Sequence, residues 1–184
     1  MPPKPQRDYW DASVFLALFQ RGDEPHLLEQ REHTIRLLED ARRGATLIVT
    51  SAFTLAEARR GDGFPPLPGE EHATLNAFFK HAYIEVVPVD RAIAELAAEY
   101  GERFRLRPGD AVQLATAVRV GASRLLAWDA NFHRAEAMRG APIKIEYPWR
   151  PADPQPPLLE AIDAAEAASA NQNADDADAG RGGA

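Results

Sequence analysis

Cysteine is absent from this chain of 184 residues, and the absence excludes several classes of site. Without thiols the chain has no disulfide scaffold, no thiolate metal site and no cysteine nucleophile. No apolar run approaches the roughly 20 residues that cross a membrane, so we expect no association with membranes. Residues 1–7 include basic side chains with no apolar core behind them, and they predict no secretory signal. These absences favour a cytoplasmic protein.

A general excess of basic charge is also missing. The formal net charge is −7, but most of the acidic excess lies near the end of the chain. From Pro151 onward there are seven acidic residues and one basic residue, which leaves 21 acidic and 20 basic residues in residues 1–150. This nearly neutral body argues against nonspecific duplex binding through a large basic face. The acidic total says little against other nucleic-acid substrates.

Short apolar or β-branched runs alternate with amphipathic segments, as is typical of an α/β fold. Alternation of this kind predicts a mostly parallel, five-stranded sheet flanked by helices. The predicted strands are residues 8–11, 46–50, 84–89, 124–128 and 143–147. The predicted helices are residues 12–20, 26–43, a segment after Ser51, and residues 70–81, 91–104 and 110–120. Residues 1–8 are rich in proline and polar side chains, and they predict a loose arm.

The composition changes after Trp149. Residues 151–157 contain four prolines, and residues 171–184 consist mainly of alanine, aspartate, asparagine and glycine. A segment with so few large apolar side chains does not bury enough surface to become ordered. We therefore predict one domain over residues 1–150 and a largely disordered tail over residues 151–184.

Four acidic residues stand at the boundaries of the predicted elements: Asp11, Glu57, Asp110 and Asp129. Asp11 and Asp129 end predicted strands, Glu57 lies on the helix after the second strand, and Asp110 opens a helix. In open α/β sheets, ligands bind at the carboxyl edge of the strands. Carboxylates that meet there repel one another unless a hard divalent cation joins them. The set therefore predicts a site for a hard divalent cation.

Each acid also has a purely structural explanation when it is considered alone. Asp11 can cap the helix that follows it. Glu57 can pair with Arg60 on a solvated helix face. Asp110 suits the first turn of a helix, where the dipole favours negative charge, and Asp129 suits an Asx turn. Only the combination points to a functional site.

The sequence around these acids resembles the PIN-domain family, especially the VapC-type toxins of bacterial toxin–antitoxin pairs. The resemblance spans residues 8 to 147 and rests on four motifs in the family's order: YWDAS at 9–13, SAFTLAE at 51–57, RPGDAVQLATA at 107–117 and LLAWDANF at 125–132. The sequence departs from the family at Gln113, where histidine is common, and at Ala127, where threonine or serine is frequent. Trp128 is bulkier than is usual at its position.

The resemblance implies a metal-dependent endoribonuclease that acts as the toxin of a type II toxin–antitoxin pair. Asp11 and Asp110 are expected to be the main ligands of Mg²⁺ or Mn²⁺. Glu57 and Asp129 are expected to bind the ion through water or to hold a second ion. Hydrolysis by an activated water would leave a 5′-phosphate and a 3′-hydroxyl.

Supporting residues and partners follow from the same resemblance. Ser13 and Ser51 are expected to orient carboxylates or to contact phosphate. Arg59 and Arg60 lie close to Glu57 in sequence, and two alternatives stay open for them: contact with substrate phosphates, or a solvated helix end. The expected partners are a structured or single-stranded RNA such as tRNA, a cognate antitoxin, and a second copy of the chain that docks through residues 26–43. Two alternatives remain open: a structure-specific DNA nuclease, and a catalytically inactive PIN-like interaction module.

Overall fold

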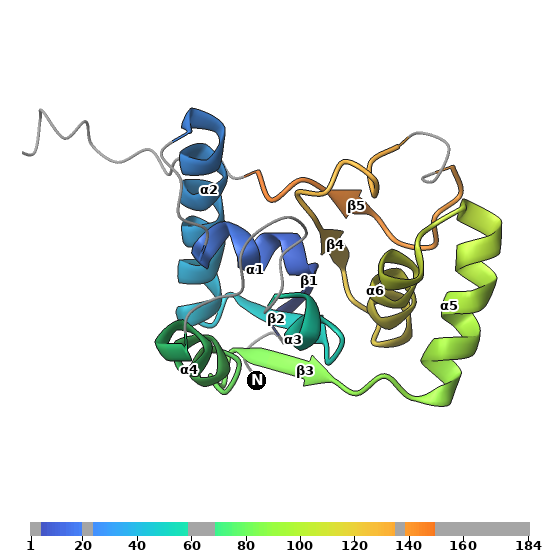
Figure 1. Cartoon of the computed structure of the whole chain (residues 1–184), viewed down its shortest axis with the longest axis horizontal. Coiled ribbons are helices and arrows are strands. Elements are labelled where there is room, and N and C mark those ends of the chain that lie inside the picture. The colour runs from blue at the N-terminus through green and yellow to red at the C-terminus, as the bar shows by residue number, and fades with distance from the viewer. Residues whose placement is uncertain (1–4, 20–23, 59–68, 135–138, 150–184) are drawn as a thin grey trace, which may run out of the picture. The chain divides into compact units, whose positions relative to one another are not determined.

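A five-stranded parallel sheet forms the centre of the protein, as the sequence predicts (Figure 1). The computed structural model describes residues 5–19, 24–58, 69–134 and 139–149, with only the backbone described for residues 69–72. The predicted tail over residues 151–184 lies outside these ranges, and the domain boundary at residue 150 stays a prediction. The strands are β1 (Gln6–Trp10), β2 (Thr46–Ser51), β3 (Ile84–Val87), β4 (Arg124–Leu126) and β5 (Ile145–Glu146).

Six helices connect the strands within the described residues. They are α1 (Ala12–Phe19), α2 (Pro25–Arg42), α3 (Thr54–Glu57), α4 (Gly69–Phe78), α5 (Arg91–Phe104) and α6 (Pro108–Arg119). Asp90 caps α5, because its side chain accepts a hydrogen bond from the backbone N–H of Ile93 (2.8 Å). Pro108 begins α6, a position where its missing N–H has no cost. No helix of the described residues is long and apolar enough to cross a membrane.

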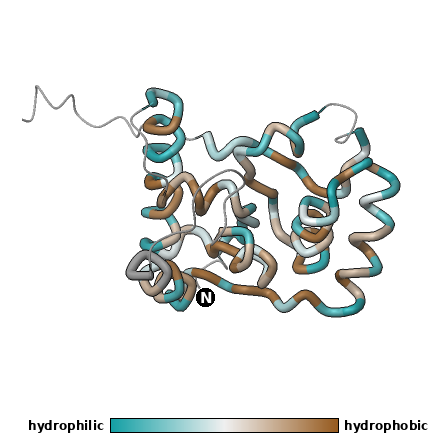
Figure 2. Tube along the Cα trace, viewed as in Figure 1, coloured by the Kyte–Doolittle hydropathy of each residue, from teal (hydrophilic) through white to brown (hydrophobic). Residues whose placement is uncertain are grey.

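The strand order is β3-β2-β1-β4-β5, and the chain reverses its direction of travel across the sheet after β3. Parallel strands joined by right-handed crossovers place their helices on opposite faces when that direction reverses. Figure 1 accordingly shows α1, α2 and α4 on one side of the sheet and α5 and α6 on the other. Figure 2 shows apolar residues concentrated on the strands, whereas α2 and α5 alternate between apolar and polar residues.

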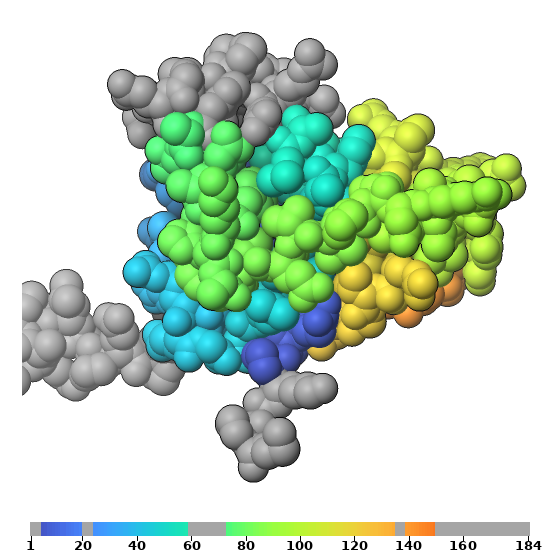
Figure 3. All heavy atoms as spheres, turned by 90° about the horizontal axis from the view of Figure 1, so that it is seen from below, coloured from blue at the N-terminus to red at the C-terminus, as the bar shows by residue number. Residues whose placement is uncertain are grey.

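Successive side chains of each strand point to opposite faces of the sheet and pack against different helices. Tyr9, Val49 and Leu125 pack with α5 and α6, and their neighbours Trp10, Ile48 and Leu126 pack with α1, α2 and α4. All six side chains are almost completely buried. The short strand β3 forms one edge of the sheet, and Figure 3 shows a face of the molecule made largely by α4, β3 and the segment leading into α5.

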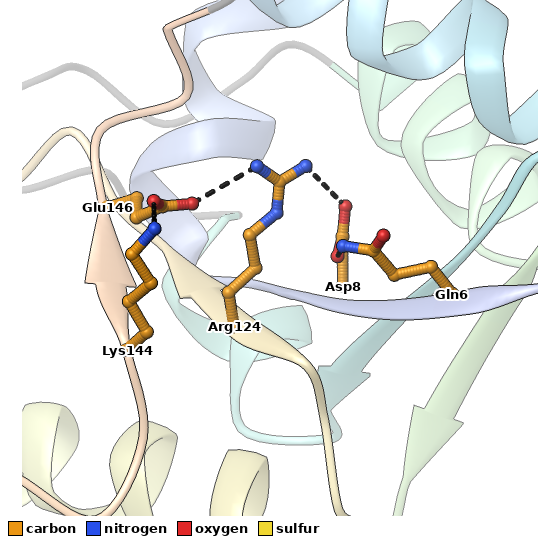
Figure 4. A network of polar contacts seen from close by, with 5 residues as sticks. All are labelled: Gln6, Asp8, Arg124, Lys144 and Glu146. Carbon is orange, nitrogen blue, oxygen red and sulfur yellow. Dashed lines mark hydrogen bonds and ion pairs between the residues drawn. The ribbon is translucent and has the colours of Figure 1, made fainter.

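The structure corrects the predicted start of the first strand. Residues 6–8 belong to β1 and are not part of a loose arm, because Asp8 is buried and its carboxylate is paired with Arg124 of β4 (2.7 Å). Arg124 lies between Asp8 and Glu146 of β5 and contacts both (3.1 Å to Glu146), as Figure 4 shows. This bridge joins three neighbouring strands on one face of the sheet.

Other predicted boundaries were too generous. β3 ends at Val87, before Pro88, and β4 ends at Leu126, so that Trp128 lies in the loop that follows. The helix after Ser51 is the four-residue α3, in which Glu57 is the last residue. Glu57 is thus held at the end of a short turn of helix near the carboxyl edge of β2.

Candidate active site

The candidate site lies where the sheet changes its direction of travel, between β1 and β4. These two strands are neighbours in the sheet, and the register pairs Trp10 with Leu126. The crevice outside the carboxyl ends of two such strands is the usual ligand site of an open α/β sheet. Asp11 follows β1 directly, and Asp129 lies in the loop after β4. Both predicted acids therefore leave the sheet on the two sides of this crevice.

Asp11 is buried and held by the residues that follow it. Its exposed fraction is 6%, and its backbone N–H donates to the carbonyl of Leu126 (3.0 Å). The Oδ2 atom accepts hydrogen bonds from the backbone N–H of Ser13 (2.9 Å) and from its hydroxyl (2.6 Å). Burial raises the pKa of Asp11, the hydrogen bonds from Ser13 oppose this, and the charge of Asp129 raises it further. The two carboxylates are thus close enough to repel each other.

Ser13 also connects the two loops that carry these acids. Its Oγ atom accepts a hydrogen bond from the backbone N–H of Trp128 (2.9 Å), the residue before Asp129. Asp129 in turn accepts a hydrogen bond from the backbone N–H of Asn131 (2.8 Å), which is the bond of an Asx turn. One hydroxyl group therefore fixes the position of Asp11 and of the backbone next to Asp129.

Glu57 is held by Gln113, a buried residue of α6. The Gln113 side-chain N–H donates to the Oε2 atom of Glu57, and its Oε1 atom accepts a hydrogen bond from the Tyr9 hydroxyl (2.5 Å). Burial raises the pKa of Tyr9 well above its usual value, and the charges of Asp11 and Glu57 raise it further. Tyr9 therefore lies within electrostatic reach of both carboxylates, and Gln113 links it to Glu57.

Asp110 reaches the same region through the first turn of α6. The residue before it, Gly109, packs so closely on α3 that an added Cβ would lie 2.9 Å from the Oε1 atom of Glu57. Asp110 is the third residue of the helix and not its cap, in a turn where the helix dipole favours a negative charge. Asp110 and Asn131 also line one pocket, which connects the start of α6 with the loop that carries Asp129.

The structure places Asp11 and Asp129 within electrostatic reach of each other and Glu57 beside the start of α6, but it does not gather all four acids into one cluster. Across residues 5–19, 24–58, 69–134 and 139–149, no group of three or more acidic or histidine side chains is arranged to hold a metal ion by itself. Mg²⁺ keeps several waters and requires only one or two protein carboxylates. The Asp11 and Asp129 pair, with hard oxygen donors and mutual repulsion, fits such an ion.

The remaining predicted residues have different positions. The Ser51 hydroxyl accepts a hydrogen bond from the backbone N–H of Phe53 (3.1 Å), which stabilises the turn between β2 and α3. Arg59 and Arg60 lie outside the described residues. Sequence reasoning gave no role to Tyr9, and it treated Gln113 only as a departure from a family pattern. A polar side chain inside the apolar run from Ala111 to Ala117 was the available signal for Gln113.

Comparison with protein families gave one match over most of the described chain. The model of the PIN domain matches residues 9–138. A search of curated proteins found no match.

Several solved structures share the fold. A toxin–antitoxin complex from Klebsiella pneumoniae has 16% identity and a TM-score of 0.53, over 78% of this chain and 99% of that one. Mycobacterium tuberculosis VapC20, a toxin that cleaves the sarcin–ricin loop, has 20% identity and a TM-score of 0.55, over 78% and 99%. VapBC2 from Rickettsia felis, bound to a DNA fragment from its promoter, has 14% identity and a TM-score of 0.54, over 77% and 98%. Identities this low establish likeness of fold alone.

Proposed function

We propose, from the premise that this chain belongs to the PIN domain family, that it is a metal-dependent endoribonuclease. The observation that carries the proposal is the position of buried Asp11 and of Asp129 on the two sides of the switch point between β1 and β4, within electrostatic reach of each other. The carboxylates of such a pair repel each other, and they gain most from a bound divalent cation. A nucleic-acid phosphodiester is a substrate that such an ion can activate.

Asp11 and Asp129 would hold the ion at the mouth of the crevice, in place of the pair of Asp11 and Asp110 that the sequence predicts. Asp110 and Glu57 would complete its surroundings through bound water. When bound, Mg²⁺ or Mn²⁺ supplies a water of lowered pKa and neutralises charge on the scissile phosphate. Ser13 keeps the Oδ2 atom of Asp11 in place with two hydrogen bonds. Gln113 orients the Glu57 carboxylate and is itself fixed by Tyr9. These positioning contacts lie outside the set of predicted ligands.

The biological role that we propose is the toxin of a toxin–antitoxin pair. Its support is the likeness of fold to the toxin of M. tuberculosis and to the complexes from K. pneumoniae and R. felis. An antitoxin that inserts a basic side chain between Asp11 and Asp129 would relieve the same repulsion as the metal ion. For a second copy of the chain, α2 offers Leu28 and Ile35, which are 40% and 41% exposed.

Cleavage of total bacterial RNA by the purified protein tests the proposal. We expect cleavage in Mg²⁺ or Mn²⁺, none in EDTA, and none with Asp11→Asn. The control is Glu99→Gln, which removes an exposed carboxylate of α5 that is not among the predicted site residues. Sequencing the 5′ ends of the products would identify the cleavage sites. Equal cleavage by Asp11→Asn and the wild type would reject the proposal, and cleavage of single-stranded DNA without RNA would favour the DNA nuclease.

A further inference from the structure

A pocket with a mainly basic wall opens beside the candidate site, at the junction of α5 and α6. Its volume is about 520 Å³, and its wall includes Arg103, Arg105, Arg107 and Arg134, with Asp110 as the one acid among the described wall residues. The wall joins the candidate site at two places. Asp110 is one of the predicted ligands, and the backbone N–H of Asn131, another wall residue, donates to Asp129. A ligand in this pocket would therefore lie next to the carboxylates.

The turn between α5 and α6 brings three of these arginines to the same pocket. Arg105 ends α5 with φ = 54° and ψ = 41°, and it is the one residue other than glycine with a positive φ in the described part of the chain. This left-handed conformation is unfavourable for a residue with a Cβ atom, and such strain clusters at binding sites. Glycine would serve better if the position had only to end a helix.

The guanidinium groups are available to a ligand. Arg103, Arg105, Arg107 and Arg134 are all exposed at the residue level, and none of the four forms an ion pair with a described carboxylate. The Arg103 guanidinium lies over the ring of Phe104, 5.0 Å from its centroid, which restricts its motion. Four cations around one pocket with one acid select a ligand with concentrated negative charge.

We propose that this pocket binds a backbone phosphate of the RNA next to the scissile phosphate. The identification of the ligand as RNA rests on the proposed function, whereas the preference for phosphate rests on the arginines. The planar guanidinium group matches a phosphate with two parallel hydrogen bonds. With one phosphate held among the arginines, the chain continues past Asp110 toward Asp11 and Asp129. The pocket then sets which phosphodiester bond reaches the carboxylates.

The test is equilibrium binding of a fluorescein-labelled single-stranded oligouridylate in EDTA, measured by fluorescence anisotropy. Arg107→Gln and Arg134→Gln should each weaken binding about tenfold, as expected for a lost charge-assisted contact. Each should also make the slope of log K against log salt concentration shallower by about 0.7. The matched control is Arg91→Gln at the far end of α5, where the arginine pairs with Glu95 in solvent (2.7 Å). It should bind within about twofold of the wild type.

The Arg105→Gly variant shows whether the Arg105 side chain binds RNA or only helps the turn between α5 and α6 to fold. Glycine accepts the left-handed conformation, so the melting temperature should equal or exceed that of the wild type, while RNA binding weakens as it does in Arg107→Gln. Binding by all three pocket variants equal to that of Arg91→Gln, or no binding by the wild type, would overturn the proposal. If the wild type cleaves RNA with a metal ion but the pocket variants bind RNA as well as the wild type, the pocket proposal is rejected and the nuclease proposal stands. If the pocket variants bind RNA more weakly than the wild type but the wild type cleaves no RNA, the nuclease proposal is rejected and the pocket proposal stands.

Discussion

The side-chain amide of Gln113 donates a hydrogen bond to the Glu57 carboxylate across the junction of α6 and α3. Gln113 is completely buried, and its carbonyl oxygen is occupied by the Tyr9 hydroxyl (2.5 Å). Its amide can therefore present only N–H groups to Glu57. The contact orients one oxygen of Glu57 through an N–H donor that does not titrate.

Replacement of Gln113 by methionine removes this contact at nearly constant volume. We expect cleavage to fall about tenfold, and the free energy of unfolding to fall by about 2 kcal/mol because the buried Tyr9 hydroxyl loses an acceptor. The concentration of Mn²⁺ needed for half-maximal cleavage should also rise, which a loss of stability alone would not cause. Gln113→His keeps an N–H donor and should recover most of the activity. Wild-type cleavage and Mn²⁺ dependence in Gln113→Met would rule out the positioning role.

The buried carboxyl group of Asp11 should destabilise the metal-free protein as pH rises. Because burial raises its pKa above 3.8, the folded state favours the protonated form. Asp11 therefore contributes fully to the free energy of unfolding below pH 3.8. This contribution is lost as the pH rises through the pKa of Asp11 in the folded state. In EDTA, Asp11→Asn should be more stable than the wild type at pH 7, and the difference should shrink as pH falls. Urea unfolding from pH 4.5 to 7.5 measures this.

The same variant provides the control for metal binding. Mn²⁺ should raise the melting temperature of the wild type, because an ion that binds only the folded state stabilises it, and should leave Asp11→Asn nearly unchanged. A metal-free variant that is less stable than the wild type at pH 7 would contradict the account of Asp11 as a destabilising charge.

The order of the elements could be predicted because hydrophobic periodicity is a local signal. Five strands and the helices between them follow from runs such as Thr46–Ser51 and from the period of α5, whose predicted bounds, Arg91 and Phe104, match those of the structure. Strand β1 was predicted to start at Asp8, two residues late, because Gln6 and Arg7 are polar and Asp8 was also assigned to a loose arm. The burial of Asp8 depends on Arg124, which is 116 residues away. No local pattern contains that pairing.

The site was predictable to a similar extent. Sequence position predicted Asp11 and Asp129 at strand ends, and the structure places Asp11 directly after β1 but Asp129 three residues after the end of β4. Their role in catalysis stays a prediction. The roles of Tyr9 and Gln113 depend on the packing of α6 against β1 and α3, and local sequence does not encode that packing. The arginine pocket was missed for the same reason, since Arg134 meets the turn between α5 and α6 only in the folded chain.

The ion pair between Asp8 and Arg124 should contribute more to the free energy of unfolding than the more exposed pair between Arg7 and Glu85. Arg124→Leu leaves the Asp8 carboxylate, which is 1% exposed, with Gln6 as its hydrogen-bond donor (2.9 Å), and the free energy of unfolding should fall by about 3 kcal/mol. Arg7→Leu breaks the pair with Glu85, whose side chains are 35% and 42% exposed, and should cost less than about 1 kcal/mol. Equal losses in urea unfolding would show that the burial of Asp8 has no energetic consequence.

Gly109 offers a test of the close approach between α6 and Glu57. In an ordinary helix position, glycine to alanine stabilises by about 1 kcal/mol. At Gly109 the new Cβ would lie 2.9 Å from the Oε1 atom of Glu57 and 3.1 Å from Cε1 of Phe53, so the Glu57 carboxylate must move. We expect Gly109→Ala to gain no stability and to lose at least about tenfold in cleavage, because a displacement of about 1 Å in a positioned group has effects of this size or larger.

Gly101 is the matched control for this change, because it lies in α5 and an added Cβ would lie at ordinary contact distance, 3.8 Å, from the Cβ of Ala111. Gly101→Ala should raise the free energy of unfolding by about 0.5–1 kcal/mol and leave cleavage unchanged. Thermal unfolding and RNA cleavage, measured on both variants, separate helix propensity from the displacement of Glu57. If both variants gain stability and cleave RNA at the wild-type rate, then the position of the Glu57 carboxylate beside α6 does not matter for catalysis.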